Sequence, residues 1–284
     1  MRIGFFLDSE QDVPFFKAAC DDMGVTMAGF TAPGVSSATG FDGFTLATEL
    51  LGNLDVAVVS VGSGCGIDTA TKLLRNGIDL FLTDISACSA YDLATLRDLA
   101  QEIGCMVGVN RPLGLAKGLV VPHTKSFPLL ADVRREIMWI PNDRIFKEVL
   151  LSDLSAALLL NQGGVKKLRV AGMPYQGRTP VQLNLWIEFD NASTMVYSLA
   201  HSCVHEKLNL RITFADGTMA SSNAIHPFFS NSIDDEYRKT VCKENLAHFV
   251  THIESSRIDV FDLDKGIETL SLADLVVNKL VSVL

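Results

Sequence analysis

Residues 54–112 constrain the fold of this chain more than any other stretch. They contain three short apolar runs, at residues 56–61, 80–82 and 105–109, separated by two amphipathic segments. The apolar positions at helical spacing are Ala70, Leu73 and Leu74 in the first segment and Leu93, Leu96, Ala100 and Ile103 in the second. Continuous apolar runs are typical of strands buried on both faces. Because strands and helices alternate, the strands should pair in parallel through right-handed crossovers, which predicts a doubly wound, Rossmann-like α/β domain.

The segment before this stretch predicts the start of the same domain. We expect a buried strand at residues 2–7, a helix at residues 14–23 with a proline in its first turn, and a second strand at residues 25–30. Residues 31–43 are rich in Gly, Ser, Ala and Thr and predict a loop, and residues 44–51 predict a short helix.

An Arg-Pro pair at Arg111 and Pro112 ends this domain, because proline disfavours helical backbone at the residue before it. We therefore predict two domains, residues 1–112 and residues 113–284. In the second, helices are predicted at residues 129–137, 144–160, 243–255 and 270–281, and strands at residues 168–173, 181–189, 194–200 and 207–214. The strands alternate apolar and polar residues, which predicts a C-terminal α+β domain with a largely antiparallel, open-faced sheet. We expect a homodimer through that open face.

Composition narrows the functional classes. The net charge of −9 disfavours binding to nucleic acid, which needs a basic face. The apolar runs are far shorter than the ~20 residues of a membrane-spanning helix, so no membrane association is expected. The apolar start is followed at once by Asp8 and Glu10, which indicates a strand rather than a signal peptide. Six cysteines without C-x-x-C spacing indicate free thiols in a reducing compartment, and we expect a cytoplasmic protein.

Several stretches resemble one enzyme family. They are LDVAVVSVGSGCGIDTATKLLRNGIDLFL, LAQEIGCMVGVNRP, the pair LNLWIEFDNASTMVYSLAH and LRITFADGTMA, and the tail SRIDVFDLDKGIETLSLADLVVNKL. The first resembles the TPN-type loop and its flanking elements in the Gfo/Idh/MocA oxidoreductases (glucose–fructose oxidoreductase, inositol dehydrogenase). The second resembles the v-G-x-N-R ending of their dinucleotide domain, the third their F-x-n-G-a strand pair and G-t-x-G-t turn, and the tail their terminal helix.

The resemblance implies that NAD(P) binds across the first domain and that a sugar, polyol or related small molecule binds in the cleft between domains. It also implies catalysis by a lysine of an E-K-P motif, with an aspartate and a histidine from the helix at residues 144–160. The sequence departs from each of these features.

The loop after the first strand lacks the glycines of the G-x-G-x-x-G motif that lets a backbone approach a pyrophosphate. Leu7, Ser9 and Asp12 stand at the glycine positions, and Asp8, Glu10 and Asp12 are acids. Like charges ~4 Å apart repel by about 4 kcal/mol at a surface site, whereas a helix terminus attracts an anion by only about 0.3–1 kcal/mol. NAD(P) is therefore disfavoured in this loop; the alternative is that Asp8, Ser9 or Asp12 caps the first helix.

Should a nucleotide bind, we expect its contacts at Ser9, Thr31, Ser60, Gly62 and Ser63. Thr31 ends the second strand, where NAD-binding domains carry an acid that binds a ribose hydroxyl, and no arginine follows closely enough to indicate NADP. Gly62 and Ser63 belong to a loop of small residues that follows a strand and would admit a ligand.

Asp84 and Asp153 are the candidate catalytic residues. The resemblance aligns Asp84 with the lysine of E-K-P and places Asp153 near the aspartate and histidine pair. Aspartate cannot stabilise a developing alkoxide, but Asp84 can act as a general base, bind a cationic ligand or cap a helix. Asp153 is expected either to face the cleft or to lie on a solvated helix face. Asn110 and Arg111 are expected to contact substrate or to brace the hinge.

Two further motifs allow a chemical role beside a structural one. Cys65 is either a reactive thiol or part of a plain tight turn, and no histidine near it in sequence would activate it. His201, Cys203 and His205 share one face at strand spacing, but no further ligand pair is visible to complete a metal site.

The sequence leaves two hypotheses. In the first, the chain is a catalytically silent homologue that binds a small molecule or acts as a scaffold. In the second, it is an NAD(P)-dependent oxidoreductase on a sugar, polyol or related substrate, with an unconventional site. The acidic loop and the aspartate at the lysine position favour the first.

Overall fold

The computed structural model describes most of the chain as two compact units. The first unit comprises Met1–Arg111 and Lys239–Leu270, and the second comprises Pro112–Arg238 and Ser271–Leu284. The described residues are 1–7, 13–31, 54–61, 66–83, 85–110, 126–137, 143–161, 163–174, 180–201, 207–224, 233–254 and 263–283. The predicted loop beyond Thr31 and the predicted helix at residues 44–51 lie outside them.

The first unit is built on a five-stranded parallel sheet. Its strands are β1 (Arg2–Phe6), β2 (Thr26–Thr31), β3 (Val56–Val59), β4 (Asp79–Leu82) and β5 (Val107–Val109). Their order is β2-β1-β3-β4-β5, and every neighbouring pair is parallel. The central strands are buried on both faces, as continuous apolar runs require. This confirms the predicted doubly wound α/β fold.

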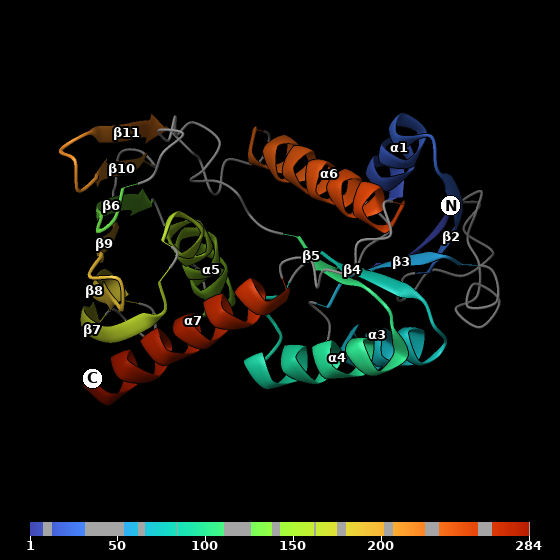
Figure 1. The fold of residues 1–284 in the computed structure, drawn as a ribbon, viewed down its shortest axis with the longest axis horizontal. Coiled ribbons are helices and arrows are strands. Elements are labelled where there is room, and N and C mark those ends of the chain that lie inside the picture. The colour runs from blue at the N-terminus through green and yellow to red at the C-terminus, as the bar shows by residue number, and fades with distance from the viewer. Residues whose placement is uncertain are drawn as a thin grey trace. The chain divides into compact units, whose positions relative to one another are not determined.

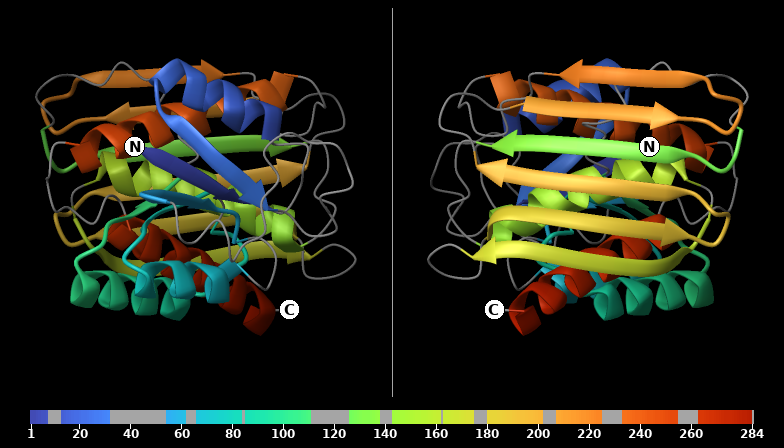
Figure 2. Two further views of the ribbon diagram at one scale, coloured as in Figure 1. Left: turned by 90° about the vertical axis from the view of Figure 1, so that its right-hand side faces the viewer. Right: turned by 90° about the vertical axis from the view of Figure 1, so that its left-hand side faces the viewer.

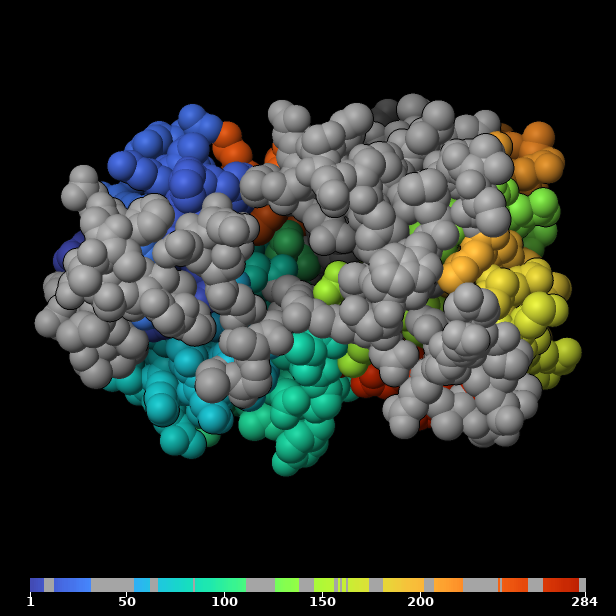
Figure 3. Space-filling view, turned by 180° about the vertical axis from the view of Figure 1, so that it is seen from behind, coloured from blue at the N-terminus to red at the C-terminus, as the bar shows by residue number. Residues whose placement is uncertain are grey.

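Helices cover both faces of this sheet (Figure 1). Helices α1 (Val13–Met23) and α6 (Ile233–Glu254) lie on one face, and α3 (Gly66–Arg75) and α4 (Ala90–Ile103) lie on the other. From behind, α3 and α4 form adjoining parts of the surface (Figure 3). Helix α6 begins ten residues earlier than the predicted helix at residues 243–255.

Helix α4 shows how the sequence sets an element's ends. Ser89 caps its N-terminus in a capping box with Asp92, and Gly104 caps its C-terminus with a φ of 83°, which glycine adopts without strain. All four apolar positions at helical spacing lie in this helix; Leu93, Leu96 and Ala100 are buried, and Ile103 is exposed. Ile103 is exposed because the helix ends there, before its next turn could cover the side chain.

Aromatic packing explains why Lys239–Leu270 belongs to the first unit. Phe249 of α6 packs on Phe81 of β4, with ring centroids 5.6 Å apart, and Phe16 of α1 packs on Phe5 of β1 at 4.9 Å. A Cβ atom on Gly108 of β5 would lie 2.6 Å from the Phe249 ring, so only glycine permits this approach. The predicted domains were continuous ranges, whereas this unit combines two separate ranges of the chain.

The second unit contains a six-stranded mixed sheet (Figure 2). In the order β11-β10-β6-β9-β8-β7, neighbours are antiparallel except β6 and β9, which are parallel. The strands are β6 (Leu130–Ile137), β7 (Val165–Pro174), β8 (Pro180–Phe189), β9 (Thr194–His201), β10 (Lys207–Thr213) and β11 (Met219–Ala224). This confirms the predicted, largely antiparallel sheet; β11 had no predicted counterpart.

The predicted helix at residues 129–137 is wrong, because this segment is strand β6. Its apolar residues also fit a helical spacing, but the burial pattern alternates, with every second side chain from Ala131 to Ile137 buried. One of these buried positions is Arg135. Because this residue is charged, the sequence does not show a regular alternation of apolar and polar residues here. Pairing with β10 and β9 on its two sides decides the conformation.

Helix α5 (Asp143–Leu160) and the C-terminal half of α7 (Leu263–Val283) complete the second unit. Helix α5 confirms the predicted helix at residues 144–160, and α7 begins earlier than predicted. The right-hand view of Figure 2 shows the strands in front of these helices, so the near face of the sheet carries no described helix. Among the helices in the described ranges, none combines the length and apolar character needed to cross a bilayer.

Candidate functional site

The carboxyl edge of the parallel sheet carries a row of polar residues. Ser60, Thr83 and Asn110 each follow the last residue of a strand and continue the backbone ladder by one step. Their backbone amides donate to carbonyls of the neighbouring strand in the sheet. Ser60 donates to Phe6 at 2.8 Å, Thr83 to Val59 at 3.0 Å and Asn110 to Leu82 at 2.7 Å. In open parallel sheets, ligands bind outside this edge, at the point where the strand order reverses. That point lies here between β1 and β3.

The side chains of this row are hydrogen-bonded to one another. The hydroxyls of Ser60 and Thr83 lie 3.1 Å apart, and Asn110 Nδ2 donates to the Thr83 carbonyl at 3.1 Å. Asn245 of α6 donates from Nδ2 to Asn110 Oδ1 at 2.8 Å. Because a carbonyl can only accept, the bond to the Thr83 carbonyl requires the Nδ2 group of Asn110 to face Thr83. The bond from Asn245 to Oδ1 is consistent with the same orientation of the Asn110 amide. We call Ser60, Thr83, Asn110 and Asn245 the edge row; all four are uncharged.

Three of the predicted binding residues lie at this edge. Thr31 pairs with Phe6 at the end of β2, and its carbonyl accepts from the amide of Leu7 at 2.9 Å. Ser60 and Asn110 belong to the edge row. Their binding role stays a prediction. The binding roles of Ser9, Gly62, Ser63 and Arg111 and the catalytic role of Asp84 also stay predictions, because these residues lie outside the described ranges.

Asp153 lies elsewhere, in the interior of the second unit, where it forms a buried charged trio with Arg135 and Tyr197. Both carboxylate oxygens are engaged: Arg135 donates from Nε to Oδ2 at 2.6 Å and from Nη2 to Oδ1 at 2.5 Å. The Tyr197 hydroxyl donates to Oδ2 at 2.9 Å. The trio joins α5, β6 and β9, and the Asp153 side chain is 0% exposed.

Burial raises the pKa of Tyr197 well above its ordinary value, and the negative charge of Asp153 adds to this effect. Tyr197 is therefore a neutral donor at all physiological pH values. Of the two positions expected for Asp153, the solvated helix face is wrong, because the side chain is fully buried. Its catalytic role stays a prediction that this geometry does not favour, since every oxygen already serves the fold.

Sequence reasoning missed Thr83, Asn245, Arg135 and Tyr197. Thr83 stands beside Asp84, to which the resemblance drew attention. Arg135 lay in a segment predicted as helix, so nothing in the sequence indicated that its side chain would pair with Asp153 of α5. Asn245 is 135 positions from Asn110 in the chain, and no local pattern links them.

The thiols and histidines of the described part offer no metal site. Cys20, Cys88, Cys105 and Cys242 form no disulfide, and no group of three or more potential metal ligands occurs among the described residues. Burial, with a contribution from the charge of Asp21, raises the pKa of Cys20 to about 12, so this thiol is unreactive. Burial lowers the pKa of His201. Cys65, Cys203 and His205 lie outside the described residues.

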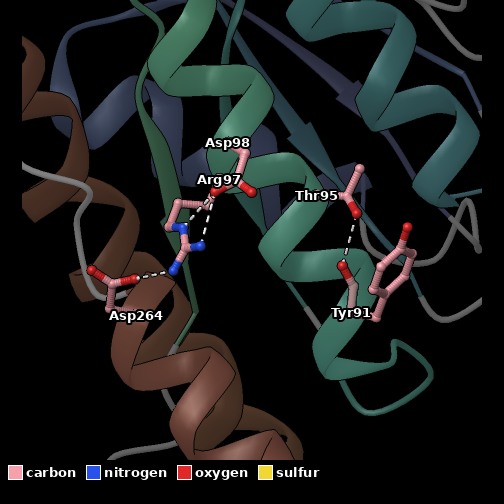
Figure 4. A network of polar contacts seen from close by, with 5 residues as sticks. All are labelled: Tyr91, Thr95, Arg97, Asp98 and Asp264. Carbon is pink, nitrogen blue, oxygen red and sulfur yellow. Dashed lines mark hydrogen bonds and ion pairs between the residues drawn. The ribbon is translucent and has the colours of Figure 1, made fainter.

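An exposed polar network on α4 contrasts with both clusters (Figure 4). Arg97 donates to Asp98 at 2.9 Å and 2.8 Å, and to Asp264 of α7 at 3.1 Å. The Thr95 hydroxyl donates to the Tyr91 carbonyl of the same helix at 2.9 Å. The bond from Arg97 to Asp264 joins α4 to α7 at the surface of the first unit. Nothing about these contacts indicates a ligand.

Comparison with known proteins assigns the fold. No family model matches the chain, and no curated protein sequence matches it. Solved structures do match over nearly the whole length. UDP-N-acetylglucosamine 3-dehydrogenase GnnA from Acidithiobacillus ferrooxidans is 14% identical, with a TM-score of 0.73 over 97% of this chain and 96% of that one.

Two further structures give the same result. Apo scyllo-inositol dehydrogenase from Lactobacillus casei is 8% identical, with a TM-score of 0.70 over 98% of this chain and 95% of that one. GenD2 from gentamicin A biosynthesis, solved in complex with NAD, is 10% identical, with a TM-score of 0.71 over 96% of this chain and 92% of that one. The chain therefore has the fold of the Gfo/Idh/MocA-type dehydrogenases, as the sequence resemblance predicted.

Proposed function

With that dehydrogenase fold as the premise, we propose that the protein binds a small molecule at the carboxyl edge of its parallel sheet and is not a standard NAD(P) dehydrogenase. The observation that carries this proposal is the buried charged trio. The family resemblance expects an acid and a histidine to serve catalysis from α5. In this chain the acid, Asp153, holds Arg135 and Tyr197 in the interior, and no histidine occurs between His123 and His201.

The sequence around the edge supports the same proposal. The segment that follows β1 contains Asp8, Glu10 and Asp12 in place of phosphate-binding glycines, and Asp84 replaces the catalytic lysine. A carboxylate at that position reverses the charge that would stabilise a developing alkoxide. These residues lie outside the described ranges.

Titration of the purified protein with NADH and with NADPH tests the proposal, with nicotinamide fluorescence and the melting temperature as readouts. Saturable binding would stabilise the fold by about 2.7 kcal/mol at a hundredfold excess over the dissociation constant. We expect neither a fluorescence change nor a melting shift with either nucleotide. Saturable binding followed by substrate-dependent oxidation would refute the proposal.

The second candidate is an NAD(P)-dependent oxidoreductase acting on a sugar, polyol or related substrate. It is favoured by the reversal of strand order between β1 and β3 and by a similar structure solved with NAD. Of the residues expected to hold the cofactor, the structure describes Thr31 and Ser60, which offer hydroxyls but no positive charge for the phosphates. NAD(P), when bound, would supply the hydride acceptor. Should binding appear, Asp84→Lys is expected to increase turnover.

We further propose that the protein forms a homodimer through the open face of the second unit's sheet. Trp186 on β8 is 44% exposed there, and three other large apolar side chains on this face are exposed: Leu130, Met173 and Met219. Trp186→Arg should convert the dimer to a monomer in size-exclusion chromatography with light scattering. Tyr91→Arg is the matched control, because Tyr91 is an exposed aromatic residue on α4 of the first unit and is not part of this sheet. An unchanged mass for Trp186→Arg would refute the interface.

A further inference from the structure

The sulfur of Met219 on β11 accepts a hydrogen bond from a cation. Arg211 of β10 donates to it from Nη2 at 3.3 Å, and the Met219 side chain is 61% exposed. A thioether sulfur is a weak acceptor, and an arginine binds a carboxylate more strongly. Asp132 of β6 lies opposite Arg211 in the sheet, but Arg134 donates to both of its oxygens, at 3.2 Å and 3.0 Å. Within the described ranges, the Met219 sulfur is thus the one acceptor bound by the Arg211 side chain.

A guanidinium in this position favours attack of the thioether on hydrogen peroxide. The bond from Arg211 occupies one lone pair of the sulfur, and the other attacks the peroxide. As the S–O bond forms, the O–O bond breaks and negative charge develops on the departing oxygen. The remaining N–H groups of the exposed Arg211 can donate to that oxygen.

The reaction is a two-electron transfer from sulfur to peroxide. The proton of the transferred oxygen passes to the departing hydroxide, so the products are methionine sulfoxide and water. The sulfoxide oxygen is a stronger acceptor than the original sulfur, and Arg211 can bind it with a charge-assisted hydrogen bond. Oxidation also converts an apolar side chain into a polar one. Since Met219 is one of the large apolar side chains on the open sheet face, a sulfoxide there removes apolar surface from that face.

Met173 on β7 provides a comparison within the same sheet. Strands β7 and β11 are the two outermost strands of the sheet, and Met173 is 59% exposed. Within the described ranges, no side chain donates to the Met173 sulfur. Two methionines of nearly equal exposure therefore differ in the presence of a guanidinium. Met195 of β9 is 1% exposed and serves as an unreactive reference.

We propose that Met219 is a site of oxidation by hydrogen peroxide, that Arg211 promotes this reaction, and that the sulfoxide weakens the association of two copies through the open sheet face. The third step rests on the proposed homodimer. The first two steps concern a single chain and do not depend on it.

Peroxide treatment of the full chain, followed by mass spectrometry of its peptides, tests the first two steps. The reaction is run on the Trp186→Arg variant, which is expected to be monomeric, so that no second copy covers the face. We expect Met219 to be oxidised about fivefold faster than Met173, the effect of one net hydrogen bond on the barrier. Arg211→Thr should make the two rates equal. Arg169→Thr is the matched control, because it removes an exposed arginine of the same sheet that does not contact Met219.

Two results of this experiment overturn the inference. One is equal oxidation of Met219 and Met173 when Arg211 is present. The other is a difference between them that persists in Arg211→Thr, which would show that the guanidinium does not promote the reaction. Melting temperatures of the variants, compared with that of the Trp186→Arg parent, check that each variant is folded.

Light scattering over a dilution series of the wild-type chain, before and after peroxide treatment, tests the third step. The dissociation constant should rise about tenfold, the effect of one polar group placed in an apolar contact, and methionine sulfoxide reductase should reverse the change. Met219→Leu should show no rise, because leucine keeps the apolar surface and has no sulfur. An equal rise in wild type and Met219→Leu would refute the role of this site.

The same measurements separate this inference from the proposed homodimer. A wild-type chain that is monomeric before peroxide treatment refutes the homodimer, and the third step with it. The ratio of Met219 to Met173 oxidation then decides the first two steps. A dimer that forms but has equally reactive methionines keeps the proposed homodimer and overturns the inference.

Discussion

The polar clusters of the two units differ in charge and in exposure to solvent. The first unit places the uncharged side chains of Ser60, Thr83 and Asn110, all partly exposed, at the ends of its strands, with the buried Asn245 of α6 behind Asn110. The second unit places a charged carboxylate, a guanidinium and a phenol completely inside its core. Among the described residues, Asn110 Nδ2 donates to one carbonyl although it carries two protons, whereas the carboxylate of the trio has both oxygens engaged.

This difference separates a group that serves a ligand from one that serves the fold. Removing two charges from water is costly, so a buried pair survives only when each charge has partners in good geometry. Such a pair cannot release a partner to bind substrate without a large penalty. Neutral groups at a sheet edge carry no comparable penalty. The free energies of unfolding of single variants should therefore differ sharply between the two clusters.

Arg135→Met should have the largest effect. It leaves Asp153 buried without its cation, and breaking a buried pair in this way costs about 3–5 kcal/mol of unfolding free energy. Urea denaturation of the purified variant measures the loss. The double variant Arg135→Met/Asp153→Leu should recover most of it, because neither charge then remains. A single variant with wild-type stability would show that the trio is not structural.

Tyr197→Phe should cost less, about 1.5–3 kcal/mol, because Asp153 keeps its bond to Arg135 and loses one charge-assisted hydrogen bond. It should also change the response to alkaline pH. The pKa of Tyr197 is raised in the folded state, so its stabilisation is complete below the unfolded value of about 10 and is lost as the pH rises through the folded value.

Parallel urea titrations at increasing pH above about 9 measure this dependence. Wild type should lose up to about 1.4 kcal/mol per pH unit more than Tyr197→Phe. The same slope for both proteins would mean that Tyr197 ionises freely and is not held neutral by the interior.

Asn245→Ala should cost about 1 kcal/mol, the net value of one neutral hydrogen bond, even though it belongs to the edge row. Thermal unfolding measures it, with Thr251→Ala as the reference on the same helix, because the Thr251 hydroxyl donates to the Ala247 carbonyl within α6. A loss as large as that of Arg135→Met would abolish the distinction between the two clusters.

Ser60→Ala should have the smallest effect on stability, about 0.5 kcal/mol or less, because the Ser60 hydroxyl is partly exposed and water replaces its bond to Thr83. Its effect on ligand binding should exceed its effect on folding. Urea denaturation beside wild type measures the change in stability, and a loss as large as that of Arg135→Met would contradict a ligand-binding rather than a structural role for this hydroxyl.

The first unit was the more predictable one because its signals are local. Continuous apolar runs such as Val56–Val59 indicate strands buried on both faces, and Ser89 and Gly104 mark the ends of a helix. Thr31, Ser60 and Asn110 could be placed at the edge for the same reason, since each ends a strand in the sequence.

The rest of the site depends on distant partners. Arg135 interrupts an apolar alternation, and only its pairing with Asp153 explains a charge at that position. Asn245 reaches Asn110 from a helix that the chain forms more than a hundred residues later. Neither contact leaves a pattern within one segment, so periodicity and turn chemistry could not reveal them.

The packing of Phe249 on Phe81 has a consequence for biosynthesis. The parallel sheet is encoded before residue 110, yet part of the face that α1 shares with α6 stays uncovered until the ribosome has delivered α6. Contacts that close so late raise the contact order and expose aggregation-prone surface during synthesis. A fragment truncated after the first domain should therefore need a chaperone, and supplying α6 as a separate peptide should rescue it.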